Sequence, residues 1–144
     1  MINEKVGKKQ LDHLVRGCSF VVDTFDRNDS RLDVNEVCVN QGIAASHGFV
    51  QDMSEEIITV LPGKTPCLHC VLDENFPELK ETPVLGFAAG MVGIQMAAAT
   101  IKYLTGFGIL KTGCRLIWDM TMDHFYDVPL TQQLKCPVCS FLNS

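Results

Sequence analysis

Two Cys-x-x-Cys pairs constrain the fold of this chain more than any other feature. The first pair is Cys67 and Cys70, and the second is Cys136 and Cys139. A two-residue spacer lets a tight turn direct two thiolates at one point, and two such turns supply the four sulfur ligands of a tetrahedral metal ion. Because the pairs lie far apart in sequence, a shared ion would fix the C-terminal tail to the body of the fold. We predict a structural zinc, since four thiolates leave no open position for water.

Other chemistry for the two pairs is weaker. A redox pair of the thioredoxin kind opens a helix after a strand, whereas Pro62, Gly63 and Pro66 place the first pair in a loop and only five residues follow the second. Disulfides are disfavoured because the chain has seven cysteines, an odd number, and no secretory signal. Iron in a rubredoxin-like site uses the same four sulfurs and stays open.

The whole chain has the length and composition of one globular domain. It has 144 residues, is 47% hydrophobic and 20% charged, and carries a formal net charge of −5. Acidic charge without a basic stripe disfavours nucleic acid, because the phosphate backbone would be repelled. The N-terminus lacks the apolar core of a signal peptide, so we expect a cytoplasmic protein. We expect the remaining cysteines to be small core residues; these are Cys18, Cys38 and Cys114.

An apolar segment from Val84 to Ile101 has no charged residue and could be taken for a membrane span. It barely reaches spanning length and contains Gln95 and Thr100. We therefore predict a buried helix of a soluble protein, with no membrane association.

Hydrophobic periodicity predicts an α/β fold in which the later strands need not be parallel. Helices are expected over residues 3–16, from Asp29 or Ser30 to Gly42, and from a Thr82 cap with Pro83 as its first residue to Gly106. Strands are expected over residues 18–22, 43–50, 57–61, 115–120 and 123–130. The predicted order after the first helix is β-α-β-β-α-β-β.

Acidic residues gather at the end of the first predicted strand, where the chain reads VVDTFDRNDSRLDVNEVC over residues 21–38. Open α/β sheets bind ligands at the carboxyl ends of their strands. Asp23 and Asp26 there could hold Mg²⁺ against substrate phosphates. The alternative is structural: Asp23 and Asp29 would cap turns, and Arg31 would pair with a carboxylate.

The ordered motifs resemble the ThiF/MoeB/HesA family, which are relatives of the ubiquitin-activating enzymes. Asp23, Asp26, Arg31 and Asn35 fall at the spacings of that family's Asp-x-x-Asp-Asn-x-x-x-Arg-x-x-x-Asn pattern. The resemblance continues through VLPGKTPCLHC, the helix that ends AATIKYLTGFG, and CPVC. It implies a mixed sheet with flanking helices that forms the C-terminal part of a Rossmann-like fold, with one zinc held by both cysteine pairs.

By this resemblance the family adenylates the C-terminal glycine of a ubiquitin-like or sulfur-carrier protein, using ATP and Mg²⁺. Asp26 corresponds to the aspartate that binds magnesium and triphosphate and is the candidate catalytic residue. Asp23, Asp26 and Arg31 are the candidate cofactor-binding residues. The resemblance also implies a homodimer.

Three departures from the family limit what this chain is expected to do alone. The sequence contains no G-x-G-x-x-G fingerprint, so the Gly-rich nucleotide-binding half is expected to be missing. Arg27 replaces the asparagine after Asp26. Residues 73–86 contain no cysteine for a thioester.

Two functions follow for the chain, which we treat as one domain over residues 1–144 with a zinc-binding excursion at 62–82 joined to a tail at 131–144. In the first, it is the C-terminal part of an adenylating enzyme, either a piece of a longer chain, a subunit of a split enzyme or a truncated paralogue, and is inactive alone without the Gly-rich N-terminal half. Alternatively it is a non-catalytic, zinc-stabilised module that binds a carrier protein or precursor peptide. In either case an unpaired sheet edge beside Phe20, Val21 and Val22 predicts association with a second polypeptide.

Overall fold

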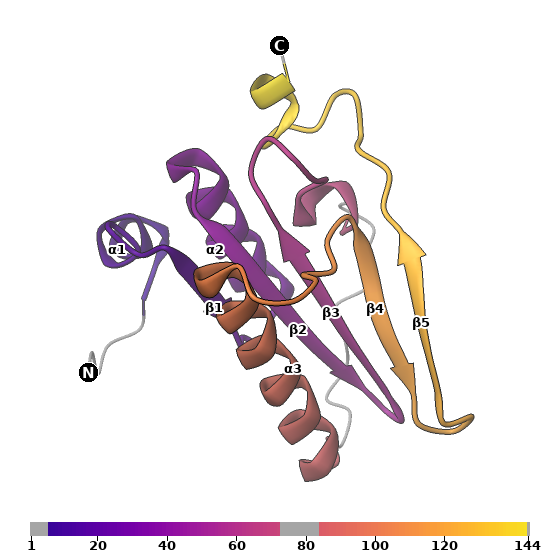
Figure 1. Cartoon of the computed structure of the whole chain (residues 1–144). Helices are drawn as coiled ribbons and strands as arrows, with labels where there is room; N and C mark the ends of the chain where they lie inside the picture. The colour runs from indigo at the N-terminus through magenta and orange to yellow at the C-terminus, as the bar shows by residue number, and fades with distance from the viewer. Residues whose placement is uncertain (1–5, 73–83, 144) are drawn as a thin grey trace.

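The computed structural model describes residues 6–72 and 84–143. One five-stranded sheet runs through the molecule, with helices on both of its faces (Figure 1). The elements are α1 (Lys8–Leu14), β1 (Phe20–Asp23), α2 (Asn28–Gln41), β2 (Ala44–Gln51), β3 (Ser54–Val60), the short 3₁₀ helix η1 (Leu68–Cys70), α3 (Gly86–Thr105), β4 (Cys114–Asp119), β5 (His124–Pro129) and the 3₁₀ helix η2 (Ser140–Asn143).

The sheet is mixed, as predicted, and its strands follow chain order from β1 to β5. β1 pairs with β2 in parallel through the α2 crossover, and the other three pairings are antiparallel. The register places Asp23 beside His47 at the carboxyl end of β1. The order β-α-β-β-α-β-β is confirmed, and the sheet arrangement brings the predicted acidic residues to one edge.

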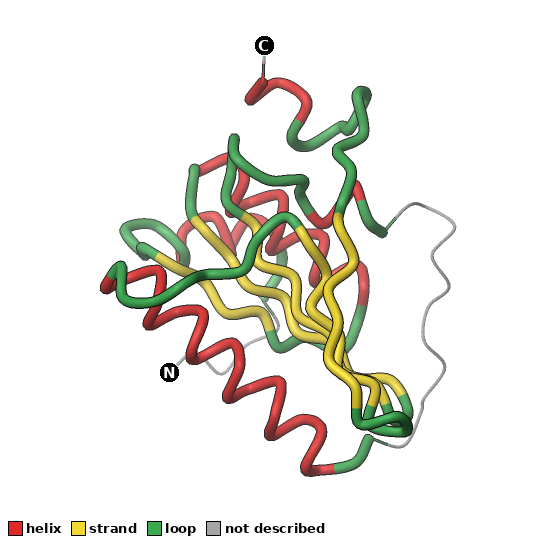
Figure 2. Tube along the Cα trace, turned by 45° about the vertical axis from the view of Figure 1, so that its right-hand side comes forward, coloured by secondary structure: helices red, strands yellow, loops and turns green. Residues whose placement is uncertain are grey.

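Helices cover both faces of the sheet (Figure 2), and each face carries its own core. On one face Val92 and Met96 of α3 pack on Ile57 of β3. On the other face Val39 of α2 and Ile58 of β3 join a cluster that includes three of the paired cysteines. The metal-ligand candidates are therefore part of the hydrophobic core.

Helix ends depart from prediction by a few residues. α2 begins at Asn28 with Arg27 as its N-cap, so Asp29 lies in the first turn, where its charge favours the helix dipole. α2 ends at Gln41, and its C-cap Gly42 lies in the left-handed region, φ 68°, as a glycine allows. α1 is shorter than predicted and ends at Leu14; part of its predicted range lies outside the described residues.

α3 corrects the prediction of a buried helix. Although it has the length and composition of a membrane span, only 22% of its most apolar window is buried, and one face packs on the sheet. Its opposite face is exposed, with Ile94 68% accessible. It begins at Gly86 and ends at Thr105, with Gly106 as the predicted C-cap; the predicted start at Thr82 and Pro83 lies outside the described residues.

The three cysteines outside the two pairs differ in burial. Cys38 and Cys114 are buried as expected, but Cys18 is exposed, so the prediction of a core residue was wrong there. Cys18 lies before β1 begins, in the link from α1, where it is outside the core that its neighbours Phe20 and Val21 partly enter.

β1 forms an edge of the sheet, because β2 is its only strand neighbour among the described residues. Val22 is 44% exposed, and the ring of Phe20 lies 5.2 Å from that of Tyr103 on α3. The predicted unpaired edge is therefore present in the described part of the chain.

Gly48 lets α3 approach the sheet closely. A Cβ at this position would lie 2.4 Å from Cγ1 of Val92 and 2.8 Å from Cε of Met96. We expect Gly48→Ala to lower the free energy of unfolding by about 1–3 kcal/mol through overpacking. The matched control is Gly93→Ala on α3, which meets open space and should stabilise by about 0.5–1 kcal/mol. Urea unfolding distinguishes them; equal effects would contradict the close contact.

Glu55 is a buried carboxyl group on the α3 face of the sheet. Gln95 donates a hydrogen bond to its Oε1, while its Oε2 is buried without a partner in the described structure. Burial raises the pKa of Glu55 to about 7, opposed by the bond from Gln95.

A carboxyl whose pKa is higher in the folded than in the unfolded chain destabilises the fold as pH rises through that interval. We therefore expect the melting temperature to fall between pH 5 and pH 8 in part because Glu55 ionises. Glu55→Gln, which resembles the protonated group, should raise the melting temperature at pH 8 and leave it nearly unchanged at pH 5. A control is Glu36→Gln on α2, which pairs with Lys8 near the surface. A Glu55→Gln effect that does not depend on pH would contradict this assignment.

Candidate functional site

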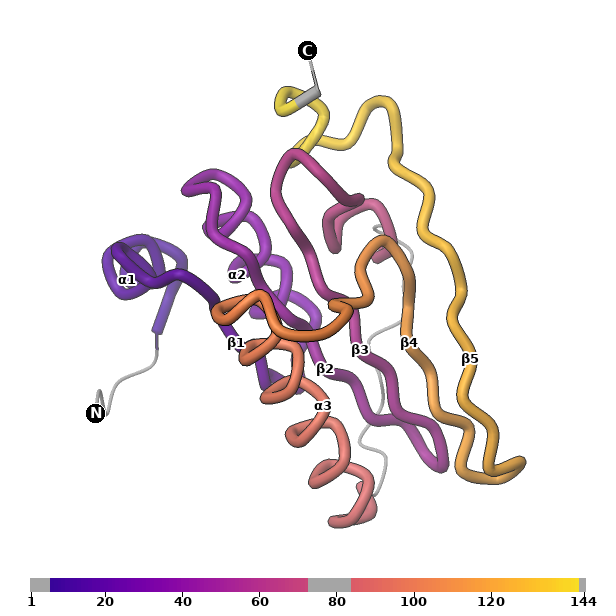
Figure 3. The backbone as a smooth tube through the Cα atoms, in the orientation of Figure 1, coloured from indigo at the N-terminus to yellow at the C-terminus, as the bar shows by residue number. Residues whose placement is uncertain are grey.

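The two cysteine pairs meet at one end of the sheet. After β3, Cys67 is the N-cap of η1 and Cys70 is its last residue. The C-terminal tail lies at the same end of the sheet (Figure 3) and brings Cys136 and Cys139 to this turn. All four sulfur atoms lie within 4.8 Å of one another. The Sγ atoms of Cys67 and Cys136 are 3.6 Å apart, and those of Cys70 and Cys139 are 3.5 Å apart. Ligands about 2.3 Å from a tetrahedral zinc would be separated by about 3.8 Å. The cluster could therefore hold a metal ion.

The protonation state of these thiols depends on whether a cation lies between them. Burial raises the pKa of the Cys67 thiol and raises that of Cys70 to about 11. Four thiolates so close together repel one another, and a divalent cation removes that repulsion. Metal binding at this cluster would thus release protons.

Amide side chains surround the sulfur cluster. Gln132 Nε2 lies 3.6 Å from the Sγ of Cys139, and Gln133 Nε2 donates to the backbone oxygen of Cys70 over 3.2 Å. Asn35 of α2 contacts the turn between Cys67 and Cys70. Sequence reasoning did not assign these roles; only Asn35 was noted, as part of a spacing pattern.

Asp23 is the last residue of β1 and its carboxylate is buried, with the residue 2% exposed. Oδ1 accepts a hydrogen bond from the backbone N–H of Phe25 over 2.9 Å. Oδ2 lies 2.7 Å from Nδ1 of His47 and 3.8 Å from Nη1 of Arg31. Both carboxylate oxygens therefore have partners within the protein.

Arg31 bridges the carboxyl end of β1 and strand β2. Its Nη1 donates to the backbone oxygen of Gly48 over 2.5 Å, and its guanidinium carbon lies 4.2 Å from the centroid of the Phe49 ring. Burial lowers the pKa of Arg31, and the charges of Asp23 and Asp26 oppose this. Arg31 is thus a buried structural cation near the predicted acidic site.

Asp26 lies exposed in the loop that follows β1. Arg27, the predicted cationic neighbour, pairs with Asp29, with Nη2 2.8 Å from Oδ2. This pair lowers the pKa of Asp29 to about 2. Of the three candidate cofactor-binding residues, Asp26 is the exposed one. Asp23 accepts a hydrogen bond from the loop, and Arg31 lies beside Asp23 in the interior.

His47 was missed by sequence reasoning. It is fully buried in β2, and its Nε2 has no partner in the described structure. Its only sequence signal is a polar ring within the run of small and apolar residues over 43–50. That signal identifies an unusual strand residue but not its partner Asp23, which lies on another strand.

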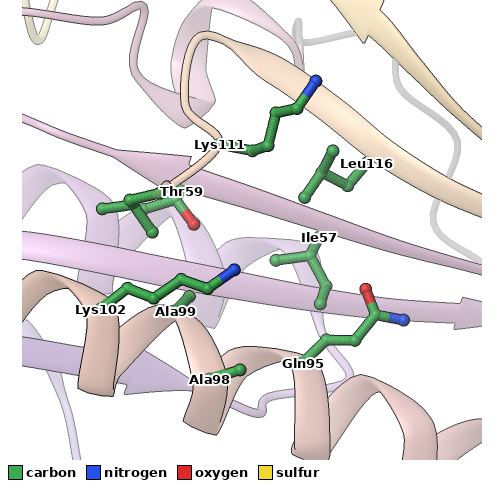
Figure 4. Close-up of a pocket in the computed structure, with 9 residues that line it drawn as sticks. Ile57, Thr59, Gln95, Ala98, Ala99, Lys102, Lys111 and Leu116 are labelled. Atoms are coloured by element: carbon green, nitrogen blue, oxygen red, sulfur yellow. The ribbon is translucent and has the colours of Figure 1, made fainter. Parts of the chain in front are cut away.

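A small cavity of about 120 Å³ lies elsewhere, between α3 and strands β3 and β4 (Figure 4). Its walls combine apolar side chains with Thr59, Gln95, Lys102 and Lys111. Neither the sulfur cluster nor the Asp23–Asp26 loop contributes to it. We therefore keep the candidate functional site at those two clusters.

Known proteins resemble this chain in sequence and in fold. The model of the ThiF family matches residues 1–138. The chain belongs to the ThiF family. The SAMP-activating enzyme E1 of Haloferax volcanii is 31% identical over 143 residues, which cover 96% of this chain and 53% of that protein. The sulfur carrier protein ThiS adenylyltransferase of Bacillus subtilis is 40% identical over 104 residues, covering 70% of this chain and 31% of that protein.

Solved structures agree on the fold of this ThiF-family chain. The crystal structure of Escherichia coli MccB with ATP matches with a TM-score of 0.78 and 18% identity, covering 96% of this chain and 43% of that chain. At that identity the similarity concerns the fold alone. The chain spans about half the length, or less, of the relatives that it matches.

Proposed function

We propose that this chain is part of an enzyme that adenylates the C-terminus of a ubiquitin-like or sulfur-carrier protein, or of a precursor peptide, with ATP and Mg²⁺. Relatives named as an E1-like activating enzyme and as a ThiS adenylyltransferase support this class of reaction. The single observation that carries the proposal is Asp26. It is an exposed residue in the loop that follows β1, and that loop is bound through the backbone N–H of Phe25 to Asp23, which is buried beside Arg31 and His47.

In this reaction a terminal carboxylate attacks the α-phosphate of ATP and pyrophosphate leaves. Asp26 would hold Mg²⁺, which neutralises charge on the phosphates. Asp23 and Arg31 are proposed to position the loop. The nucleotide also needs backbone N–H groups at a Gly-rich turn, and this sequence has no G-x-G-x-x-G. We propose that a Gly-rich half, on the same or a separate polypeptide, supplies that turn.

ATP–pyrophosphate exchange tests this function. The chain with its carrier protein should show no exchange, because phosphate binding is incomplete. Exchange should appear when the Gly-rich half is added, and Asp26→Asn should then abolish it. The control is Asp52→Asn, at an exposed turn residue with φ 52° that asparagine tolerates. Exchange by the chain alone, or full exchange by Asp26→Asn, would refute the proposal.

The second candidate is a non-catalytic module that binds a carrier protein or precursor peptide. Arg27 beside Asp26 and the absence of cysteine from residues 73–86 favour it. Carrier binding that persists while exchange never appears, even with the Gly-rich half present, would select this function.

For the sulfur cluster we propose one structural zinc per chain, held by Cys67, Cys70, Cys136 and Cys139. Complete four-sulfur sites suit zinc or iron, and their sulfur geometry leaves no position for a reacting water. We treat residues 1–144 as one domain in which the excursion at 62–82 is joined to the tail at 131–144 by this metal. Metal analysis of the purified protein tests the ion, with iron as the alternative result.

We further propose that this chain is cytoplasmic and that it is not a free monomer. The β1 edge would accept a strand of the Gly-rich half, and a stripe along α3 would pair with a second copy. The apolar side chains of the stripe are 57–68% exposed, and glycine and alanine between them allow close approach. The stripe consists of Phe87, Gly90, Ile94, Ala97, Ile101 and Leu104.

Light scattering at micromolar concentration checks this association. Ile94→Asp should shift the chain toward monomer, because it places a charge in the middle of the paired stripe. Leu134→Asp, at an apolar residue 96% exposed outside α3, should leave the mass unchanged. A monomer before any substitution would contradict association.

A further inference from the structure

Asn35 connects helix α2 to the first cysteine turn. The residue is completely buried. Its Oδ1 accepts a hydrogen bond from the backbone N–H of Leu68 over 2.9 Å, and its Nδ2 lies 3.0 Å from Nδ1 of His69. Leu68 and His69 are the two residues between Cys67 and Cys70, so one side chain contacts the whole spacer of the metal-binding turn.

The two contacts fix the roles of the atoms. Because Oδ1 of Asn35 accepts from Leu68, its Nδ2 carries the protons and donates to His69. Nδ1 of His69 must then be the acceptor, and the ring proton lies on Nε2. The lone pair of Nδ1, which a metal ion would otherwise use, is occupied by Asn35.

His69 is the obvious competitor for the ion. Imidazole is a common zinc ligand, and Cys₃His sites are as ordinary as Cys₄ sites. Yet among the described residues the group whose ligand atoms lie within 4.8 Å of one another contains the four cysteines and not His69. The histidine is next to Cys70 in sequence but is turned toward α2.

We propose that Asn35 is a positioning residue of the metal site, which holds the Cys67–Cys70 turn in its binding conformation and keeps His69 out of the coordination sphere. The inference rests on the proposed metal site and not on adenylation, so failure of the proposed adenylation leaves it intact. Groups that orient metal ligands typically change metal affinity by about 10–100-fold when they are removed.

Helix α2, which carries Asn35, is anchored to the sheet close to this residue. Arg31 lies four residues earlier, on the same face of the helix, and binds the backbone oxygen of Gly48. One helix face therefore contacts both the Asp23 carboxylate at the end of β1 and the metal-binding turn. In this chain the Arg-x-x-x-Asn spacing places one residue of each cluster on the same face of α2.

Metal affinity of the full chain tests the first part. Competition with a chromophoric zinc chelator should show about 10–100-fold weaker zinc binding for Asn35→Ala. Asn35→Leu keeps the volume of the side chain and removes both hydrogen bonds, so it should show a similar loss and guards against a cavity effect. Asn40→Ala, at an exposed position of α2, is the control and should bind like the parent chain. Affinity within twofold of the parent for both Asn35 variants overturns the proposal.

Cobalt substitution tests the second part. The parent chain should give the Co²⁺ absorption spectrum of four sulfur ligands. Asn35→Leu should shift the visible bands toward those of three sulfurs and one nitrogen, and adding His69→Ala should restore the parent spectrum. An unshifted Asn35→Leu spectrum, or a shift that survives His69→Ala, overturns the exclusion of His69.

Discussion

Loss of the metal is expected to release the C-terminal tail and lower the melting temperature by about 10 °C or more, since about 4 kcal/mol suffices for such a shift at this chain length. Cys67, Cys136 and Cys139 belong to the same buried cluster as Ile58 and Val60 of β3. Structural zinc contributes folding free energy directly, with apparent values of about 10–16 kcal/mol in small zinc-binding peptides. Without the ion, the buried thiols keep only weak hydrogen bonds, and the tail retains the buried Val138 side chain and the bond from Gln133 to the Cys70 oxygen.

The β1–β3 part of the sheet should remain folded, because its other face is covered by α3 through a separate core. Hydrogen exchange after chelation should therefore show lost protection in residues 131–143 and retained protection in β2. Cys136→Ser should reproduce this result, whereas Cys114→Ser, at a buried cysteine outside the cluster, should retain the metal. Stoichiometric metal in Cys136→Ser, or global unfolding on chelation, would show that the ion has another role.

The four-cysteine cluster could be predicted because its signal is local. Each Cys-x-x-Cys turn is set by its own spacing, and a metal ion brings two turns together without regard to the chain between them. The order of strands and helices was also accessible, since short apolar runs and capping glycines such as Gly42 and Gly106 mark the elements. These features need little knowledge of tertiary contacts.

Side-chain burial was much harder to predict. The composition of α3 is apolar on most faces, yet only Ala88, Val92, Met96 and Ala99 are buried in it. An apolar sequence indicates that a helix can be covered, while the neighbouring elements decide which face is. The same limit applies to Cys18, whose apolar neighbours gave no sign that it lies outside the core.

The acidic motif shows why spacing alone does not assign roles. Asp23 and Asp26 look equivalent as metal ligands in sequence, but one ends β1 facing α2 and the other lies in the exposed loop. The partner that distinguishes them, His47, comes from a neighbouring strand through the parallel register. A single polar residue in a strand carries no information about its partner until that register is known.

Arg31→Ala is expected to lower the free energy of unfolding by about 3–5 kcal/mol, because removing one member of a buried charge pair leaves the other uncompensated. The side chain of Asp23 is completely buried, and Arg31 is the only Arg or Lys that the described structure places within 4 Å of it. The substitution also removes the donor to the Gly48 oxygen and the contact with the Phe49 ring.

The matched control is Arg16→Ala, which removes the same side chain from an exposed pair with Asp12. Exposed pairs contribute about 0–1 kcal/mol, so denaturant unfolding should separate the two variants by several kcal/mol. The double variant Asp23→Asn with Arg31→Met should recover part of the loss, since it removes both buried charges together. If Arg31→Ala is no more destabilising than Arg16→Ala, the buried cluster does not support the loop. The proposal that the buried cluster positions the Asp26 carboxylate would then lose its structural basis.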